Sequence, residues 1–212
     1  MDLSVKVDQT RYRLFYWREE RTVVQKLALA FGMACVVGLA AQARANLPGS
    51  PVPVTMQTFA VLLAGVILGR RWGGVSVTLY AGLGAAGVPW FSGGSSGLAY
   101  LAGPTGGYIL GFALACLFVG YITDRYLKAR RLINLVAIML FADFVLIFVP
   151  GLLQLGLWLH LMKGETPSLI TLLNMGLFPF VIGDIAKVIM AAVVARGIIP
   201  QRDYGTADQG RT

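Results

Sequence analysis

The sequence predicts an all-α integral membrane protein with six transmembrane helices and both termini in the cytoplasm. Of its 212 residues, 57% are hydrophobic and only 13% are charged. Two long stretches contain no charged side chain: 52 residues between Arg71 and Asp124, and 25 residues between Arg44 and Arg70. A helix that crosses the hydrocarbon core needs about 20 mainly apolar residues. The first stretch is therefore long enough for two crossings and the second for one.

The chain divides into a membrane domain and two polar tails. Residues 1–23 predict a cytoplasmic tail, residues 24–198 a six-helix transmembrane substrate-binding domain, and residues 199–212 a second cytoplasmic tail. The first helix is expected over 24–43. Ala41–Ala43 has the small-residue pattern of a signal-peptide cleavage site, but the segment before the helix is long and carries acids as well as bases. Retention of this helix is therefore favoured over cleavage.

The other helices are placed by proline, glycine and basic turns. The segment 46–53 contains three prolines, and proline is excluded from helix interiors, so a stiff loop is expected there. The segment 89–103 is rich in glycine, serine and aromatic residues, and Pro104 suits the first turn of a helix. With the basic turns Arg70-Arg71 and Asp124–Arg131 between them, helices two to six are expected over residues 54–69, 72–88, 104–123, 132–160 and 168–196.

The positions of the basic residues predict the orientation. Cytoplasmic loops of membrane proteins carry an excess of Lys and Arg. With six crossings and a cytoplasmic N-terminus, fifteen of the eighteen Lys and Arg fall on the inner side. Only Arg44 and Lys163 fall outside, and Lys187 lies within a helix. Both the proline-rich and the glycine-rich loop then face outward.

Several classes of function are disfavoured by the same sequence. The net charge of +8 follows the ends of the apolar segments, as lipid-facing cations do, so no nucleic-acid partner is expected. Cys35, Cys116 and His160 are scattered, which disfavours a metal site or a cofactor. Gly82–Gly87 matches a dinucleotide-binding string, but it lies in a membrane helix, and the acidic residue that the pattern requires about twenty positions further on is missing. No ATP-binding loop is present, so any ATP hydrolysis must belong to a partner.

The most informative feature is a pair of charges inside the sixth helix. Asp184 and Lys187 are three residues apart and share a helix face with Phe180. Each charge alone would cost about 2.5–3.5 kcal/mol at the membrane centre, and such residues usually face a cavity or the bundle interior. They therefore predict a ligand site. The alternative is an internal ion pair that holds helix six to its neighbours, with Asp143 of helix five as a further partner.

A second cluster is expected at the outer end of the bundle. Thr105 and Tyr108 share one face of helix four, the outer loop contributes Trp90 and Phe91, and helix two begins near Gln57. An apolar, aromatic pocket with a few polar groups is typical of small-molecule sites. The alternative is an aromatic belt at the membrane interface.

Small residues four apart predict close helix packing. Such pairs are Gly65 with Gly69, Gly107 with Gly111, and Ala30 with Ala34, and this spacing lets helix backbones approach in lipid. For any one pair, a chance occurrence in this composition is an equally good explanation.

Four segments resemble the BioY family in order and spacing: Pro51–Thr58, Gly87–Gly94, Gly103–Tyr108 and Gly183–Lys187. The resemblance covers about residues 24–196. BioY proteins are the biotin-binding S components of energy-coupling factor (ECF) transporters. The resemblance implies an S-component-like bundle of six helices in the plasma membrane of a prokaryote. It also implies that biotin is captured near the outer surface, under the loop before helix two.

The resemblance further implies partners and contacts. A transmembrane coupling protein and two ATP-binding-cassette ATPases would supply the energy, although some family members are thought to work without them. Asp184 and Lys187 would contact biotin, and Ala30 and Ala34 match the motif by which S components meet the coupling protein. A polar side chain, often asparagine, is expected near the ring of biotin. The asparagines of this chain are Asn46, Asn134 and Asn174.

Three other functions remain open from the sequence. The same kind of subunit could carry another vitamin. An intramembrane enzyme would need a nucleophile–base pair or metal ligands within the membrane, which one histidine and two separated cysteines do not favour. A structural membrane protein would use the Asp184–Lys187 pair only to hold its helices together.

Overall fold

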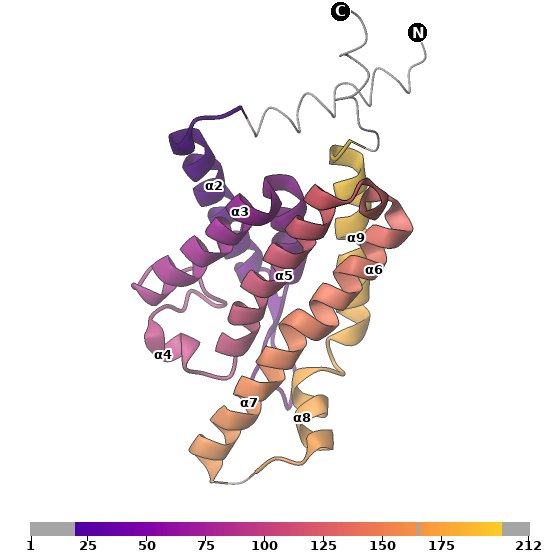
Figure 1. Cartoon of the computed structure of the whole chain (residues 1–212). Helices are drawn as coiled ribbons and strands as arrows, with labels where there is room; N and C mark the ends of the chain where they lie inside the picture. Colours follow the sequence, from indigo (N-terminus) through magenta and orange to yellow (C-terminus); the bar gives the residue numbers. More distant parts are fainter. Residues whose placement is uncertain (1–19, 165, 201–212) are drawn as a thin grey trace, which may run out of the picture.

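The computed structural model describes residues 20–164 and 166–200 as a bundle of helices (Figure 1). The predicted tails therefore lie largely outside the described residues. In chain order, the elements are α2 (Val23–Gln42), β1 (Arg44–Ala45), β2 (Val54–Thr55), α3 (Gln57–Ala85), α4 (Leu98–Leu101), α5 (Gly106–Arg125), the 3₁₀ turn η1 (Leu127–Arg130), α6 (Leu132–Phe141), the π-helical turn η2 (Ala142–Ile147), α7 (Phe148–Lys163), α8 (Leu169–Gly176) and α9 (Val181–Ile198). The all-α prediction is confirmed, and β1 and β2 form only a short antiparallel pair.

Four of the described helices are long and apolar enough to cross a membrane. They are α2, α3, α5 and the continuous helix made by α6, η2 and α7. The pair α8 and α9 adds a fifth span if it crosses as one bent unit. The total of five is one fewer than the six crossings predicted from the sequence, because α3 is counted here as one helix.

Helix α3 folds back on itself at Gly69. The backbone of Gly69 has φ 74° and ψ 178°, a conformation essentially restricted to glycine. Gln57 precedes the break and Tyr80 follows it, yet the Gln57 side-chain amide donates a hydrogen bond to the Tyr80 hydroxyl at 2.8 Å. In a straight helix these residues would be about 35 Å apart. The element therefore consists of two helices, and the break falls beside the predicted turn Arg70-Arg71.

The sixth predicted helix is also broken, which corrects the expectation of one helix over 168–196. α8 ends at Gly176 and α9 begins at Val181, with a bend of 48° between them. Pro179 lies in the gap, and its ring and missing N–H prevent a regular helix from continuing. The fifth helix, by contrast, runs unbroken over Leu132–Lys163, but it contains the unpredicted π turn η2.

Glycines let α5 approach both of its neighbours closely (Figure 1). A methyl group on Gly65 of α3 would lie 2.7 Å from the backbone oxygen of Cys116. A methyl group on Gly111 would lie 2.6 Å from the Cα of Ile147 in η2. These contacts confirm close helix packing at two of the predicted glycine pairs, since backbone meets backbone with no room for a side chain.

We expect Gly111→Ala to destabilise the bundle by about 1–3 kcal/mol, because the added methyl group must push apart two helix backbones. The measurement is thermal unfolding of the purified protein in detergent. Gly32→Ala is the matched control, since a methyl group at Gly32 meets nothing within 4 Å. Equal unfolding temperatures for the two variants would contradict the close approach of α5 and η2.

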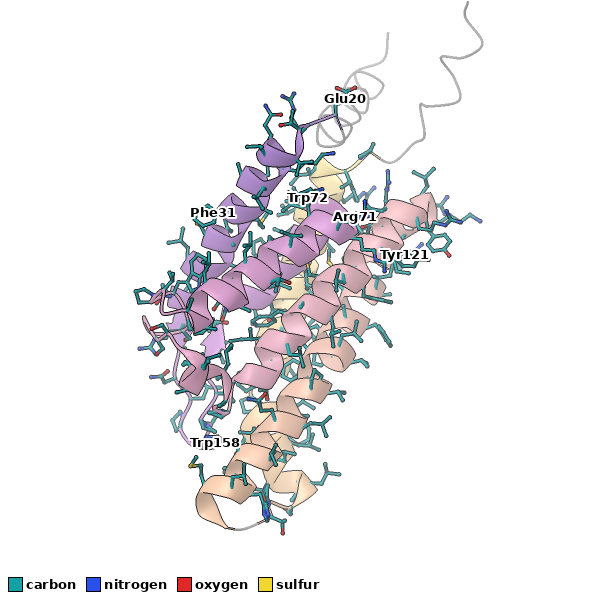
Figure 2. All side chains as sticks on the ribbon, turned by 60° about the vertical axis from the view of Figure 1, so that its left-hand side comes forward. Glu20, Phe31, Arg71, Trp72, Tyr121 and Trp158 are labelled. Atoms are coloured by element: carbon teal, nitrogen blue, oxygen red, sulfur yellow. The ribbon has the colours of Figure 1, made fainter. Side chains whose placement is uncertain are left out.

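One end of the bundle is basic. Arg71, Trp72 and Tyr121 lie at this end in Figure 2, and Trp158 lies at the other. The guanidinium of Arg70 stands 5.1 Å from the centre of the Tyr121 ring, and the Arg70 N–H donates to Asp124 at 2.9 Å. The start of α2, the break in α3 and the ends of α5 and α9 all lie here (Figure 1). We call this the basic end and the opposite one, which contains Arg44, the strap end.

Candidate functional site

The predicted charged pair lies inside the bundle on α9. Asp184 is 2% exposed and Lys187 is 5% exposed, and their side chains form an ion pair within one helix turn. Burial of an unpaired charge is costly. Each of these two charges offsets part of the desolvation cost of the other. Neither group points into lipid.

Lys187 also connects α9 to the loop before α3. Its ammonium group donates a hydrogen bond to the backbone oxygen of Thr55 in β2 at 2.9 Å. We call residues 44–55, which include β1 and β2, the outer strap. The strap is fastened at a second point, since the Ser50 hydroxyl donates to the backbone oxygen of Met175 in α8 at 2.6 Å. The prolines of the strap and these two bonds hold it across α8 and α9.

A cavity lies beside the charged pair, beneath the outer strap. Its walls come from the strap, α3, the loop 89–97, α4, α5, the η2–α7 junction and the start of α9. The lining residues are Val52, Pro53, Thr55, Gln57, Thr58, Ser92, Tyr100, Thr105, Tyr108, Ile109, Phe112, Ile147, Phe148, Phe180, Asp184 and Lys187. Segments far apart in the sequence therefore meet around one acid and one base.

The polar groups of the cavity fall into two kinds. The Tyr108 hydroxyl donates to the backbone oxygen of Gly176 at 2.8 Å, and the Gln57 side chain is bonded to Tyr80, so these groups are already used. The hydroxyl groups of Ser92 and Thr105 are buried and have no hydrogen-bond partner among the residues that the structure describes. Buried polar atoms are nearly always paired, so unpaired ones that line a cavity suggest that a ligand completes them.

Aromatic rings form one apolar wall of the cavity. Phe148 meets Tyr108 edge to face, with ring centroids 5.8 Å apart, and meets Phe180 at 6.0 Å. With Ile109 and Phe112 of α5, these rings give the cavity an apolar surface in addition to its hydrogen-bonding groups. This combination suits a small molecule with a polar head and an apolar body.

Six of the eight residues predicted to bind substrate line this one cavity. They are Gln57, Thr105, Tyr108, Phe180, Asp184 and Lys187.

Trp90 and Phe91, the other two, lie behind the cavity wall. The Trp90 indole donates to the backbone oxygen of Tyr80 at 2.9 Å. Phe91 is fully buried and stacks on Tyr100, with ring centroids 4.9 Å apart. The structure thus places them where they hold the loop 89–97 against α3, rather than on the cavity surface.

The predicted partner-contact residues lie inside the bundle. Ala30 and Ala34 are both fully buried, because their face of α2 packs against the rest of the chain. On the outer face of the same helix, Ala28 and Gly32 are exposed one turn apart. The expectation that Ala30 and Ala34 present a surface to another protein therefore does not fit this structure.

Some cavity residues were not predicted. Ser92 lies in the loop that was expected to contribute, but a serine in a Gly-Ser segment carries no specific indication of a site. Phe148 is one of many apolar residues in the fifth helix, so nothing in the sequence distinguishes it. None of the three asparagines lines the cavity, and Asn134 instead donates to the Lys128 backbone oxygen near the basic end. Among the described residues, no group of three or more His, Cys, Asp and Glu could hold a metal ion.

Comparisons with known proteins agree with one another. The model of the BioY family matches residues 10–203. The probable biotin transporter BioY of Methanothermobacter thermautotrophicus is 49% identical over 143 residues, which are 68% of this chain and 91% of that protein. The biotin transporter BioY of Thermotoga maritima is 31% identical over 156 residues, which are 71% of this chain and 82% of that protein.

A solved structure has the same fold. The crystal structure of the S-component for biotin from an ECF-type ABC transporter superposes with a TM-score of 0.71 at 24% identity, and the match covers 82% of this chain and 89% of that one. The family match spans most of the sequence and includes every segment around the cavity. The chain is thus a member of the BioY family, whose members are transporter components and not enzymes.

Proposed function

We propose that this protein binds biotin in the cavity beneath the outer strap and mediates its uptake across the membrane. The observation that carries the proposal is the buried Asp184–Lys187 pair, which lines a cavity that also contains unpaired hydroxyl groups. The relatives named as biotin transporters support the choice of ligand.

The polar part of biotin matches the chemistry of the pair. Its ureido group has two N–H donors and one carbonyl acceptor. The Asp184 carboxylate would accept from an N–H, and the Lys187 ammonium would donate to the carbonyl, both as charge-assisted hydrogen bonds. A second pose pairs Lys187 with the carboxylate of biotin. Either pose requires Lys187 to exchange or share its present bond to Thr55, which lies in the outer strap.

The apolar part of biotin matches the aromatic lining of the cavity. The thiophane ring and the valeryl chain would lie against Phe148, Phe180 and Tyr108, which form edge-to-face pairs that leave apolar ring surface at the cavity. Ser92 and Thr105 offer hydroxyl groups to a carbonyl, ureido or carboxylate group. These hydroxyls would take the place of the asparagine that the family resemblance led us to expect.

We propose that the chain crosses the membrane six times, with both termini in the cytoplasm. The two halves of α3, folded back at Gly69, would cross separately, and α8 with α9 would cross as one bent span. The basic end would then face the cytoplasm of a prokaryotic cell, and the strap end would face outward. Biotin would enter from the outer side, where the strap covers the cavity.

Uptake would depend on partners, as in the ECF transporters whose S-component shares this fold. The chain has no nucleotide-binding loop of its own, so a transmembrane coupling protein and ABC-type ATPases would supply the energy. The exposed outer face of α2, which includes Ala28 and Gly32, is a candidate contact surface for the coupling protein in place of Ala30 and Ala34.

We expect the purified protein in detergent to retain labelled biotin with nanomolar-range affinity, and excess thiamine or riboflavin to leave the label in place. Equilibrium dialysis measures both, with unlabelled biotin as the positive competitor. The binding groups are matched to a ureido donor–acceptor set, which neither competing vitamin offers in the same arrangement. Displacement by thiamine or riboflavin, with weak competition by biotin, would assign the site to another vitamin.

A further inference from the structure

A third buried acid lies next to the site. Asp143 is 0% exposed and belongs to η2, the one π-helical turn in the parts of the chain that the structure describes. Neither of its carboxylate oxygens has a hydrogen-bond partner among the described residues. An ionised carboxylate in that position would have lost its hydration without receiving donors in exchange. Local π turns are frequent at functional sites.

The face of η2 that carries Asp143 is turned toward the cavity. Ile147, about one turn further along, lines the cavity together with Phe148. Phe144, which follows Asp143, stacks on Phe148 with ring centroids 5.6 Å apart, and Phe148 contacts Phe180 at the start of α9. Asp143 itself does not line the cavity, but it lies in the same turn as Ile147, which does.

The charges of this group do not balance if both acids are ionised. Asp143 and Asp184 would contribute two negative charges, and Lys187 contributes one positive charge that is already paired with Asp184. On α5, the Tyr108 hydroxyl is bonded to Gly176 and the Cys116 thiol lies against Gly73 of α3, and neither group is a cation. The described parts of α6 and α7 bring no buried cation. The remaining buried cation among the described residues, Arg130, is bonded to Thr123 and Pro200 at the basic end.

We propose that Asp143 holds the single proton that makes this group of three side chains electrically neutral, and that loss of the proton weakens ligand binding. Asp143 acts here as a positioning residue, because its effect on the ligand passes through Lys187. Once ionised, it would compete with Asp184 and with the ligand for the ammonium group, and the released proton would go to solvent. The effect on binding rests on the proposed function of the cavity.

The first test is the pH dependence of biotin binding. From about pH 6 to about pH 9, ordinary Asp and Lys side chains do not titrate, and the comparison with D143N shows whether Asp143 causes any change in affinity. We expect the affinity of the unmodified protein to fall about tenfold or more across this range. Asp143→Asn, which mimics the protonated acid, should keep the tighter affinity throughout. A flat profile in the unmodified protein, an unchanged profile in D143N, or loss of binding by D143N at every pH would overturn the proposal.

The second test needs no ligand. The infrared difference spectrum between the unmodified protein and D143N should contain the carbonyl band of a protonated carboxylic acid, and this band should be unchanged in Asp124→Asn. A carboxylate signature for Asp143 at neutral pH would overturn the proposal. If D143N is not recovered folded, Asp143→Leu replaces it in both tests, and failure of both neutral variants to fold would show that the charge is required. Absence of biotin binding at every pH would instead refute the function proposed for the cavity, while the infrared result would still decide the protonation of Asp143.

Discussion

The double variant Asp184→Asn with Lys187→Met is expected to fold like the unmodified protein and to lose biotin binding. It removes both members of the ion pair together, so no single charge is left buried. Replacement of a buried ion pair by neutral side chains of similar volume is often neutral or even stabilising. The two charge-assisted hydrogen bonds to the ligand, each worth about 1.5–3 kcal/mol, would be lost. We expect the affinity for biotin to fall at least about a hundredfold, since each 1.4 kcal/mol is a factor of ten.

The single variants do not distinguish an effect on binding from an effect on stability. Asp184→Asn leaves the Lys187 ammonium without its ion-pair partner, and Lys187→Ala leaves the Asp184 carboxylate without its ion-pair partner. Removal of one partner from a buried pair costs about 3–5 kcal/mol of stability, which is a large fraction of the total for many proteins. Both single variants should therefore bind biotin poorly and also unfold at lower temperature. Loss of binding in them alone would not distinguish a ligand site from a structural pair.

The exchange of the two residues, Asp184→Lys with Lys187→Asp, completes the comparison. It keeps one acid and one base on the same helix face but reverses donor and acceptor, so the fold should be retained and the binding lost. Ile182→Ala, at a position that is 84% exposed on the same helix, is the control for substitution in α9. Calorimetric titration and thermal unfolding on all variants give both quantities. A stable double variant with unchanged biotin affinity would mean that the pair only holds the bundle together.

Replacement of Gly69 by alanine is expected to impair the folding of α3. Its backbone angles, φ 74° and ψ 178°, lie in a region that other residues avoid at a cost of about 1–3 kcal/mol. The reversal at Gly69 brings Gln57 to Tyr80, so a strained turn would also disturb the hydrogen bond between these residues beside the cavity. We expect less folded protein and weaker biotin binding together.

Gly82→Ala is the matched control for this substitution. Gly82 lies in the second half of α3, and an added methyl group there meets nothing within 4 Å. Because alanine favours the helix over glycine, this variant should be neutral or slightly stabilised. Fluorescence-detected gel filtration after extraction in detergent, followed by thermal unfolding, measures both variants. Equal yield and stability for Gly69→Ala and Gly82→Ala would show that α3 does not need its reversal at Gly69.

The structure differs from the sequence prediction mainly where helices bend. The sequence contains Pro179 in the middle of the sixth predicted helix, but periodicity and hydropathy cannot show that α8 and α9 are separate helices at 48°. The break at Gly69 was located to within two residues because Arg70 and Arg71 mark a polar turn in an otherwise apolar segment. The π turn at Asp143 left no such mark, since a single wide turn does not change composition.

The choice of helix face was a second source of difference. Ala30 and Ala34 share a face with each other, as their spacing predicts, but the spacing cannot say whether that face meets the chain itself or a partner. Likewise, the aromatic loop was expected to supply ligand contacts, and its rings instead pack against Tyr80 and Tyr100 while Ser92 reaches the cavity. Which face of a helix is buried, and which side chain of a loop reaches the cavity, depend on residues that are distant in the chain.

The sequence by itself determined that this is an apolar helical membrane protein with one buried acid–base pair. Those properties follow from local quantities, namely the length of charge-free segments and the cost of a charge in hydrocarbon. Only the tertiary structure decided that Lys187 bonds to Thr55, that Ser92 and Thr105 join the same cavity, and that Asp143 lies beside the pair without hydrogen-bond donors of its own. Contacts across more than a hundred residues are set by how the helices pack, and no local pattern encodes them.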